Sequence, residues 1–256
     1  MSLPAVFLGP PLAHRALHDA AQGVPENSAE AVRRAVARGY GIEIDVQPSA
    51  DGVAMVFHDE TLDRLTETTG PIRDRTVAEL ADLRLVGSDA GAPTLTEVLG
   101  IVAGRVPLLV EIKDQSGGVG ASDDDTLERA VVSALAGYDG PVALMSFNPY
   151  MVARVAELAP DLPRGLVTSG YRSEDWPGMP PEVATHLREI RDFDRVGAQF
   201  ISHDRTDLHS PHVAALKARD VPVLCWTIRS AEAEAQARKI ADNVTFEGYL
   251  PPLDAV

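Results

Sequence analysis

The 256-residue sequence has a single cysteine, Cys225, and no long apolar run. One cysteine cannot form a disulfide within the chain, and it gives no cysteine-based zinc site. Because Cys225 lies in an apolar run, residues 223–226, we interpret it as a buried and unreactive thiol. No window approaches the roughly 18 apolar residues of a membrane-spanning helix. We therefore expect no stable membrane insertion.

Basic residues are also few, since 23 Lys and Arg stand against 38 Asp and Glu, for a formal net charge of −15. This balance argues against nucleic acid or an anionic membrane surface as the main partner. It still permits an anionic small-molecule substrate, because a metal ion and a few cationic side chains reverse the field locally. Residues 1–12 have no Lys or Arg before their apolar residues and contain three prolines, unlike a signal peptide. We expect a cytoplasmic protein.

Two predicted strands carry charged residues where burial is expected. Glu43 and Asp45 alternate with apolar residues, and this period of two puts both carboxylates on one face of a strand. A later apolar run ends in Glu111 and Lys113 with the same spacing. Charged groups are rarely buried without a partner. A divalent cation between Glu43, Asp45 and Glu111 would account for both strands; the alternative is that Arg15 and Lys113 neutralise the carboxylates without a metal.

The order of predicted elements favours a (β/α)8 TIM barrel formed by one domain, residues 1–256. Beyond a helix that begins at Asn27 or Ser28 and stops at Gly39, helices are expected at 76–83, 94–102, 123–135, 150–158, 182–196, 211–219 and 231–240. The first two strands are expected near residue 12 and near residue 43. Six further strands are expected at 108–113, 142–147, 164–168, 198–203, 222–228 and 244–247. An open doubly wound sheet is the alternative, but no Gly-rich loop has the required strand-turn-helix context.

Three departures from a regular barrel are expected. The Asp51-Gly52 turn predicts that the chain returns antiparallel to the second strand. Residues from about 60 to 92 show no long apolar period, and we interpret them as a small insertion. Only nine residues follow Glu247, so the eighth helix is truncated or missing. We expect residues 1–11 or a second copy of the chain, in a homo-oligomer, to cover the side left open.

Active sites of such barrels lie at the carboxyl ends of the strands. Unusual polar or aromatic residues fall at the predicted strand ends: His14, Arg15, Glu43, Asp45, Glu111, Lys113, His203, Trp226 and Glu247. Three carboxylates without cysteine suit a hard cation, Mg²⁺ or Ca²⁺, with water and substrate oxygens completing its shell.

An ordered set of motifs carries a family resemblance. It comprises His14-Arg15, Pro25-Glu26-Asn27-Ser28, Glu43-Ile44-Asp45-Val46, Asp51-Gly52, Phe57-His58-Asp59, Leu62-Asp63-Arg64, Glu111-Ile112-Lys113, Ser146-Phe147 and Trp226-Thr227. Together they resemble the glycerophosphodiester phosphodiesterase family, in that family's order and across nearly the whole chain. The insertion after the second strand also matches the family. Two departures are Ala16, where the family usually has Gly, and Glu247, where it usually has Asp.

The resemblance implies a metal-dependent phosphoric diester hydrolase that converts glycerophosphodiesters to sn-glycerol 3-phosphate and an alcohol, within lipid and glycerol metabolism. It implies that Glu43, Asp45 and Glu111 hold the cation and that His14 and His58 form an acid–base pair. Arg15 and Lys113 would bind the phosphate, and Trp226 would line the substrate pocket.

Elementary chemistry agrees with these roles. A cation and fixed positive side chains stabilise the transition state of an anionic diester, and two histidines supply groups that titrate near neutrality. The sequence leaves open whether the glycerol hydroxyl attacks first, through a cyclic phosphate, or water attacks directly. A lysophospholipase D-like activity is an alternative, which the lack of an amphipathic or basic membrane-binding segment disfavours. A non-catalytic phosphodiester-binding barrel is another, but it would have no need for two acid–base groups.

Overall fold

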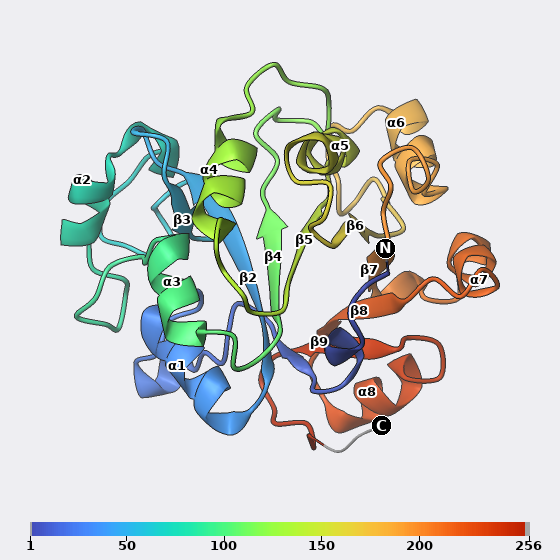
Figure 1. Ribbon diagram of the computed structural model, residues 1–256, viewed down its shortest axis with the longest axis horizontal. Coiled ribbons are helices and arrows are strands. Elements are labelled where there is room, and N and C mark those ends of the chain that lie inside the picture. Colours follow the sequence, from blue (N-terminus) through green and yellow to red (C-terminus); the bar gives the residue numbers. More distant parts are fainter. Residues whose placement is uncertain (1, 254–256) are drawn as a thin grey trace. The chain divides into compact units, whose positions relative to one another are not determined.

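The structure of the protein is a computed structural model that describes residues 2–253 (Figure 1). Strands and helices alternate along the chain in the order of a (β/α)8 TIM barrel, as predicted. By their contacts the residues group into two compact units. The first unit contains residues 12–113 and 123–142, and the second contains 2–11, 114–122 and 143–253. That the whole chain forms one domain stays a prediction.

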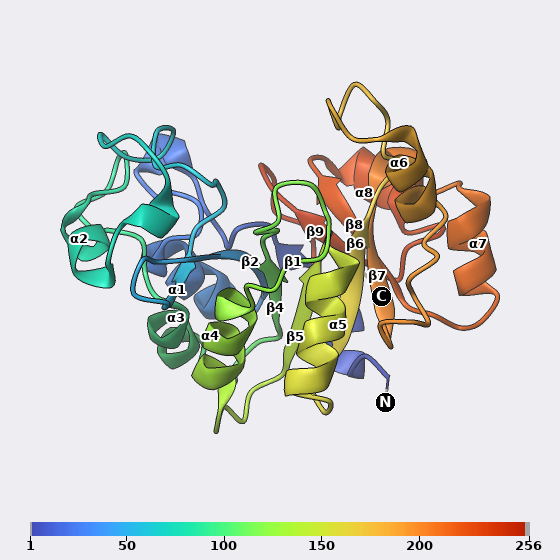
Figure 2. The same cartoon turned by 90° about the horizontal axis from the view of Figure 1, so that it is seen from above.

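The first unit is built around β2 (Gly41–Pro48), which is buried along its whole length. β1 (Leu12–Ala13) and β4 (Leu108–Ile112) pair with it in parallel, and β3 (Ala54–Val56) pairs antiparallel. The predicted antiparallel return is therefore confirmed. The helices are α1 (Ala29–Arg38), α2 (Val77–Asp82), α3 (Leu95–Val102) and α4 (Thr126–Leu135). α1, α3 and α4 pack in a row beside β2 and β4 (Figure 2).

Local signals in the sequence set the ends of these helices. The Ser28 hydroxyl accepts a hydrogen bond from the N–H of Ala31 and caps α1, while Gly39 ends it with φ 77°. Such a left-handed conformation favours glycine. Thr94 forms a capping box with Glu97 at the start of α3. Of the two predicted caps of α1, Asn27 and Ser28, Ser28 is the cap. Asn27 has a different role, described below.

The insertion shares one hydrophobic core with β3 and Phe57. Its buried members are Met55, Phe57, Leu62, Ile72, Leu80 and Leu85. The 3-10 turn η3 (Ile72–Asp74) and α2 supply part of this cluster, and the remainder comes from β3 and loops. Since every member is almost fully buried, the insertion is a packed segment rather than a free loop.

The second unit contains five parallel strands paired in sequence order: β5 (Val142–Ser146), β6 (Arg164–Thr168), β7 (Phe200–Asp204), β8 (Val223–Ile228) and β9 (Asn243–Phe246). Its helices are α5 (Pro149–Leu158), α6 (Pro181–Arg188), α7 (Pro211–Lys217) and α8 (Ala231–Ala237). The predicted helix 182–196 is too long, because α6 ends at Arg188. Ile190 has φ 51°, and a left-handed residue cannot continue a right-handed helix.

The last strand, β9, is not followed by a helix in the described residues, and the amino-terminal segment packs against it. Within residues 247–253 the structure has no helix after β9, as predicted. The 3-10 turn η1 (Ala5–Leu8) lies near β8 and β9 in Figure 1. The side-chain amide of Asn243, the first residue of β9, donates hydrogen bonds to the carbonyls of Phe7 (2.8 Å) and Pro10 (2.9 Å). Residues 2–11 are therefore packed against β9. That a second copy of the chain covers this side, in a homo-oligomer, stays a prediction.

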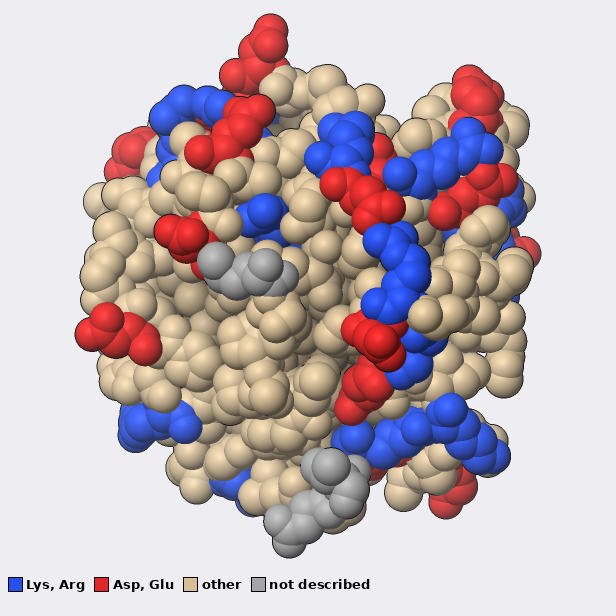
Figure 3. All heavy atoms as spheres, turned by 45° about the vertical axis from the view of Figure 1, so that its right-hand side comes forward, with Lys and Arg blue, Asp and Glu red and all other residues tan. Residues whose placement is uncertain are grey.

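Charges of both signs share the protein surface. On the face in Figure 3, basic side chains lie beside acidic ones instead of gathering in one field. In the second unit, Arg195 pairs with Asp192 at 2.6 Å and Arg219 with Asp194 at 2.5 Å. Among residues 2–253, no helix is long and apolar enough to cross a bilayer.

Candidate active site

Three carboxylates come together in the first unit. One oxygen each from Glu43, Asp45 and Glu111 lies within 4.8 Å of the others. The parallel register of β2 and β4 pairs Asp45 with Glu111, and the two-residue period of β2 adds Glu43 on the same face. These residues are only 2%, 1% and 7% exposed. The sequence prediction that these three residues form one cluster is thus realised in the structure.

Positive groups partly neutralise the three carboxylates. The Lys113 Nζ lies 2.7 Å from Asp45 Oδ1 and 2.7 Å from Glu111 Oε1. The Arg15 Nε lies 3.7 Å from Asp45 Oδ2, and the Arg15 backbone N–H donates to Glu43 Oε2 at 3.0 Å. The ion pairs of the metal-free alternative therefore exist for Asp45 and Glu111, whereas Glu43 accepts its hydrogen bond from a neutral backbone N–H.

The pKa values show that this neutralisation is incomplete. Burial, together with the charges of Asp45 and Glu111, raises the pKa of Glu43 well above its usual value. Burial also raises the pKa of Glu111, with Lys113 opposing the shift. Burial acts on Asp45 in the same direction, but Lys113, His58 and Arg15 outweigh it and hold the pKa of Asp45 well below its usual range. Without further positive charge, the cluster favours taking up a proton.

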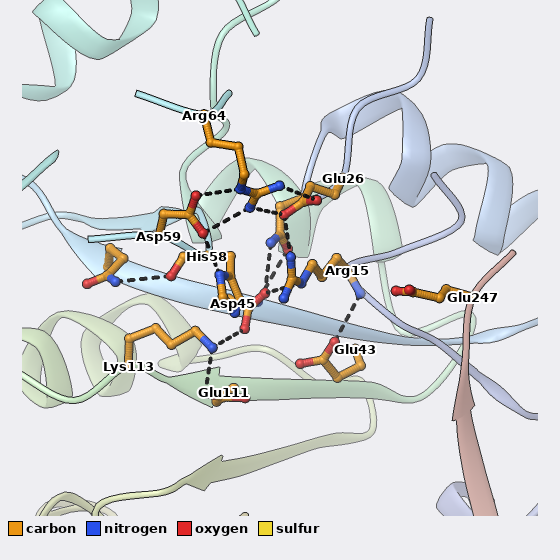
Figure 4. Close-up of polar contacts among 12 residues, drawn as sticks. Arg15, Glu26, Glu43, Asp45, His58, Asp59, Arg64, Glu111, Lys113 and Glu247 are labelled. Carbon is orange, nitrogen blue, oxygen red and sulfur yellow. Dashed lines mark hydrogen bonds and ion pairs between the residues drawn. The ribbon is translucent and has the colours of Figure 1, made fainter. Parts of the chain in front are cut away.

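Beside the carboxylates lies a chain of ion pairs (Figure 4). Nδ1 of His58 is 2.6 Å from Asp59 Oδ1. The guanidinium of Arg64 binds Asp59 on one side and Glu26 on the other. Glu26 Oε1 also accepts a hydrogen bond of 2.7 Å from Arg15 Nη1.

Burial and neighbouring charges determine the protonation states of His58 and Asp59 in this chain of ion pairs. Burial lowers the pKa of His58 to about 4, despite the opposing charge of Asp45. Burial works against ionised Asp59, but the hydrogen bonds from Arg64 and His58 hold its pKa at about 2. A neutral His58 beside an ionised Asp59 carries its proton on Nδ1, because a carboxylate only accepts hydrogen bonds. That leaves Nε2 of His58 unprotonated.

The charges of this region do not balance. Five carboxylates belong to it, those of Glu26, Glu43, Asp45, Asp59 and Glu111, and three permanent cations, those of Arg15, Arg64 and Lys113. With all five carboxylates ionised and His58 neutral, the region has two uncompensated negative charges; without a cation, the raised pKa of Glu43 favours a proton there instead. A divalent cation would cancel both charges.

The loop after β1 carries His14 and Arg15. The His14 ring is half-buried directly beyond the last residue of β1. Ala16 has φ 63°, and its N–H donates to the carbonyl of Glu43 at 2.9 Å. The position where glycine was expected therefore adopts a conformation that glycine favours, and the loop is tied to β2.

Trp226 belongs to the second unit. Its Nε1–H donates to the carbonyl of Ser202 at 3.0 Å, and its ring meets Phe147 edge to face, with centroids 5.6 Å apart. His203 is fully buried in β7, where Nδ1 lies 2.7 Å from the Thr168 hydroxyl and Nε2 lies 3.2 Å from the carbonyl oxygen of Asp207. Glu247 pairs with Arg229 Nε at 2.6 Å.

Four residues of the site were not predicted from the sequence as site residues. Glu26, Asp59 and Arg64 form the ion-pair chain, and Asn27 contacts Asp45. Each belongs to one of the motifs that carry the family resemblance, and this membership was the sequence signal that could have identified them as site residues. Their partners lie up to 38 residues away in sequence, and spacing alone does not pair them.

Comparisons with known proteins agree with this fold. Residues 14–245 match the family described as the glycerophosphoryl diester phosphodiesterase family. The chain is 36% identical over 164 residues to the glycerophosphodiester phosphodiesterase of Caldanaerobacter subterraneus subsp. tengcongensis. That match covers 60% of this chain and 66% of the other.

Solved structures are similar over most of the chain. A phosphodiesterase of Oleispira antarctica, in complex with the product sn-glycerol-3-phosphate, has a TM-score of 0.77 and 25% identity, covering 94% of this chain and 93% of the other. The glycerophosphodiester phosphodiesterase of Thermotoga maritima has a TM-score of 0.69 and 22% identity, covering 92% of each chain. The predicted TIM-barrel fold is confirmed.

Proposed function

The chain belongs to the glycerophosphoryl diester phosphodiesterase family of phosphoric diester hydrolases, and we propose that it uses a divalent cation to release sn-glycerol 3-phosphate and an alcohol from glycerophosphodiesters. The observation that carries this proposal is the buried cluster of Glu43, Asp45 and Glu111. Three carboxylates in so small a volume repel one another, and a cation relieves that repulsion.

The donor set fits a hard divalent cation. All three ligands are carboxylate oxygens, which suit Mg²⁺ and Ca²⁺. The raised pKa of Glu43 marks a place where a cation would replace a proton. The two uncompensated negative charges of the region match the charge of such an ion. When bound, the ion would withdraw charge from the phosphate oxygens.

The chain's own residues supply the remaining chemistry. Arg15 and Lys113 hold positive charge beside the cluster and would bind the anionic phosphate. His14 and His58 would transfer the protons: one takes a proton from the attacking hydroxyl or water, and the other gives one to the leaving alkoxide. For His58 the exchanging atom is Nε2, since Nδ1 faces Asp59. Both the cyclic-phosphate route and direct water attack use this pair.

We extend the proposal to the substrate and the location. Trp226 would line the pocket for the organic part of the substrate, as the family resemblance implies. The substrate would be a small glycerophosphodiester, met in the cytoplasm. Equal turnover of monomeric and micellar substrates would support this choice. Activity on micellar lysophospholipids alone would favour the lysophospholipase D-like alternative.

Metal rescue tests the function. Chelator-treated protein is assayed for sn-glycerol 3-phosphate release from glycerophosphocholine and glycerophosphoethanolamine, before and after Mg²⁺, Ca²⁺ or Mn²⁺ is restored. We expect release that requires metal and that Glu43→Gln abolishes. Glu79→Gln is the matched control, because Glu79 is an exposed carboxylate that only caps α2. A folded, metal-bound protein that releases no product from a broad panel of diesters would overturn the proposal.

A further inference from the structure

A single arginine of the insertion joins two carboxylates near the site. Arg64 Nε and Nη2 donate to the two oxygens of Asp59, at 2.6 and 2.9 Å. Arg64 Nη1 and Nη2 donate to the two oxygens of Glu26, at 2.9 and 2.7 Å. Both pairs are bidentate, the geometry that fixes a carboxylate most firmly. Four of the five guanidinium N–H groups are used within the protein, so Arg64 is committed to these partners rather than to a substrate.

Each carboxylate held by Arg64 also holds a residue of the proposed machinery. Glu26 binds the guanidinium of Arg15, and Asp59 binds Nδ1 of His58. One end of this ion-pair chain returns to the carboxylate cluster, because Arg15 Nε lies 3.7 Å from Asp45 Oδ2. The proposed phosphate ligand and the proposed acid–base group are thus linked through one side chain (Figure 4).

The insertion supplies a rigid base for Arg64. Leu62, two residues earlier, is 1% exposed in the insertion core. Its N–H donates to the carbonyl of Gly70, and its carbonyl accepts from both the N–H and the hydroxyl of Thr66. The backbone on either side of Arg64 is therefore fixed, although the side chain itself is 47% exposed.

We propose that Arg64 is a positioning residue through which the packed insertion sets the orientation of both Arg15 and His58. This inference rests on the proposed function, since those two residues act on the substrate only there. Through Asp59, Arg64 keeps the His58 proton on Nδ1 and Nε2 free to accept one. Through Glu26, it holds the Arg15 guanidinium beside the carboxylate cluster. A packed insertion, otherwise remote in sequence from β1, acquires a role in catalysis.

Steady-state kinetics test this proposal first. For Arg64→Ala we expect kcat to fall by between about tenfold and a hundredfold, the usual effect of losing an outer partner of a site, with KM changed less than about threefold. The kcat of Arg64→Lys should lie between those of the unmodified protein and Arg64→Ala, because an ammonium cannot hold both carboxylates bidentately. The double variant Arg64→Ala/Asp59→Asn should lose little more kcat than either single variant. The control is Arg73→Ala, an insertion arginine of 49% exposure paired with Asp124, and it should leave kcat unchanged.

The tautomer of His58 gives a readout that does not depend on turnover. Nitrogen NMR of the imidazole, assigned with His58→Gln, should show Nδ1–H as the single tautomer in the unmodified protein and in Arg73→Ala. In Arg64→Ala it should show a mixture with Nε2–H. An unmodified tautomer and kcat in Arg64→Ala would overturn the inference while leaving the proposed function intact. If the unmodified protein turns over no diester, the function fails and the tautomer alone decides the inference.

Discussion

Asn27 and Asp45 exchange two hydrogen bonds. The Asn27 side-chain amide donates to Asp45 Oδ2 at 2.9 Å, and its carbonyl oxygen accepts from the Asp45 N–H at 3.3 Å. Both residues are about 1% exposed. The pair fixes the direction of the Asp45 carboxylate before any ion arrives, and partners that orient a metal ligand contribute to affinity as well as to geometry.

We therefore predict that Asn27→Gly weakens Mn²⁺ binding by about tenfold or more. Glycine is the informative change, because Asn27 has φ 54° and glycine takes that conformation without strain. Asn27→Ala removes the same hydrogen bonds and adds strain, so it should also lower the thermal unfolding midpoint. Isothermal titration measures the affinity. Unchanged affinity in Asn27→Gly would show that Asp45 needs no such partner.

Lys113→Met should destabilise the metal-free protein. The ammonium is the closest positive group to both Asp45 and Glu111, and removing one partner of a buried ion pair costs about 3–5 kcal/mol. Restored Mg²⁺ should then raise the unfolding temperature more than in the unmodified protein.

The matched control is Lys217→Met. Lys217 pairs with Asp242 at 2.6 Å, but both side chains are about one-third exposed, where such pairs contribute up to about 1 kcal/mol. Thermal unfolding with and without metal compares the two variants. Equal losses would mean that the Lys113 pairs are no stronger than surface ones.

His58 should stay neutral in mild acid. Burial disfavours its charged form and lowers its pKa to about 4 in the metal-free protein, whereas an unfolded histidine titrates near 6.5. Between these pH values the unfolded chain binds more protons, so His58 makes stability fall as the pH drops from about 6.5 to about 4. An NMR titration assigned with His58→Gln measures the midpoint. A midpoint near 6.5 would mean that the ring is solvated.

The sequence predicted the strands of the site well, because their signals are local. The alternation around Glu43 and Asp45 puts both side chains on one face of β2, whichever residues of the next strand pair with them. The structure places both residues with Glu111. Arg64 and Glu26 were not paired, because their contact depends on how the insertion folds. Likewise, the end of α6 depends on one left-handed residue, Ile190, for which the sequence has no signal such as glycine.

The amino-terminal segment should contribute to stability through Phe7. Its ring is 0% exposed, whereas the neighbouring Val6 is 40% exposed. Phe7→Ala should cost about 3–5 kcal/mol of unfolding free energy, since it leaves a cavity. Val6→Ala should change it by less than about 0.5 kcal/mol. Denaturant unfolding measures both. Similar values for the two variants would indicate that residues 2–11 do not pack in solution.

The proposed function depends most on whether Glu43, Asp45 and Glu111 hold a divalent cation. The direct measurement is equilibrium binding of Mn²⁺, followed by the loss of its free electron paramagnetic resonance signal. We predict one Mn²⁺ per chain in the unmodified protein and in Glu79→Gln, with binding at least about tenfold weaker in Glu43→Gln. Mn²⁺ binding that Glu43→Gln leaves unchanged, or no Mn²⁺ binding at all, would rule out a metal site at these three carboxylates.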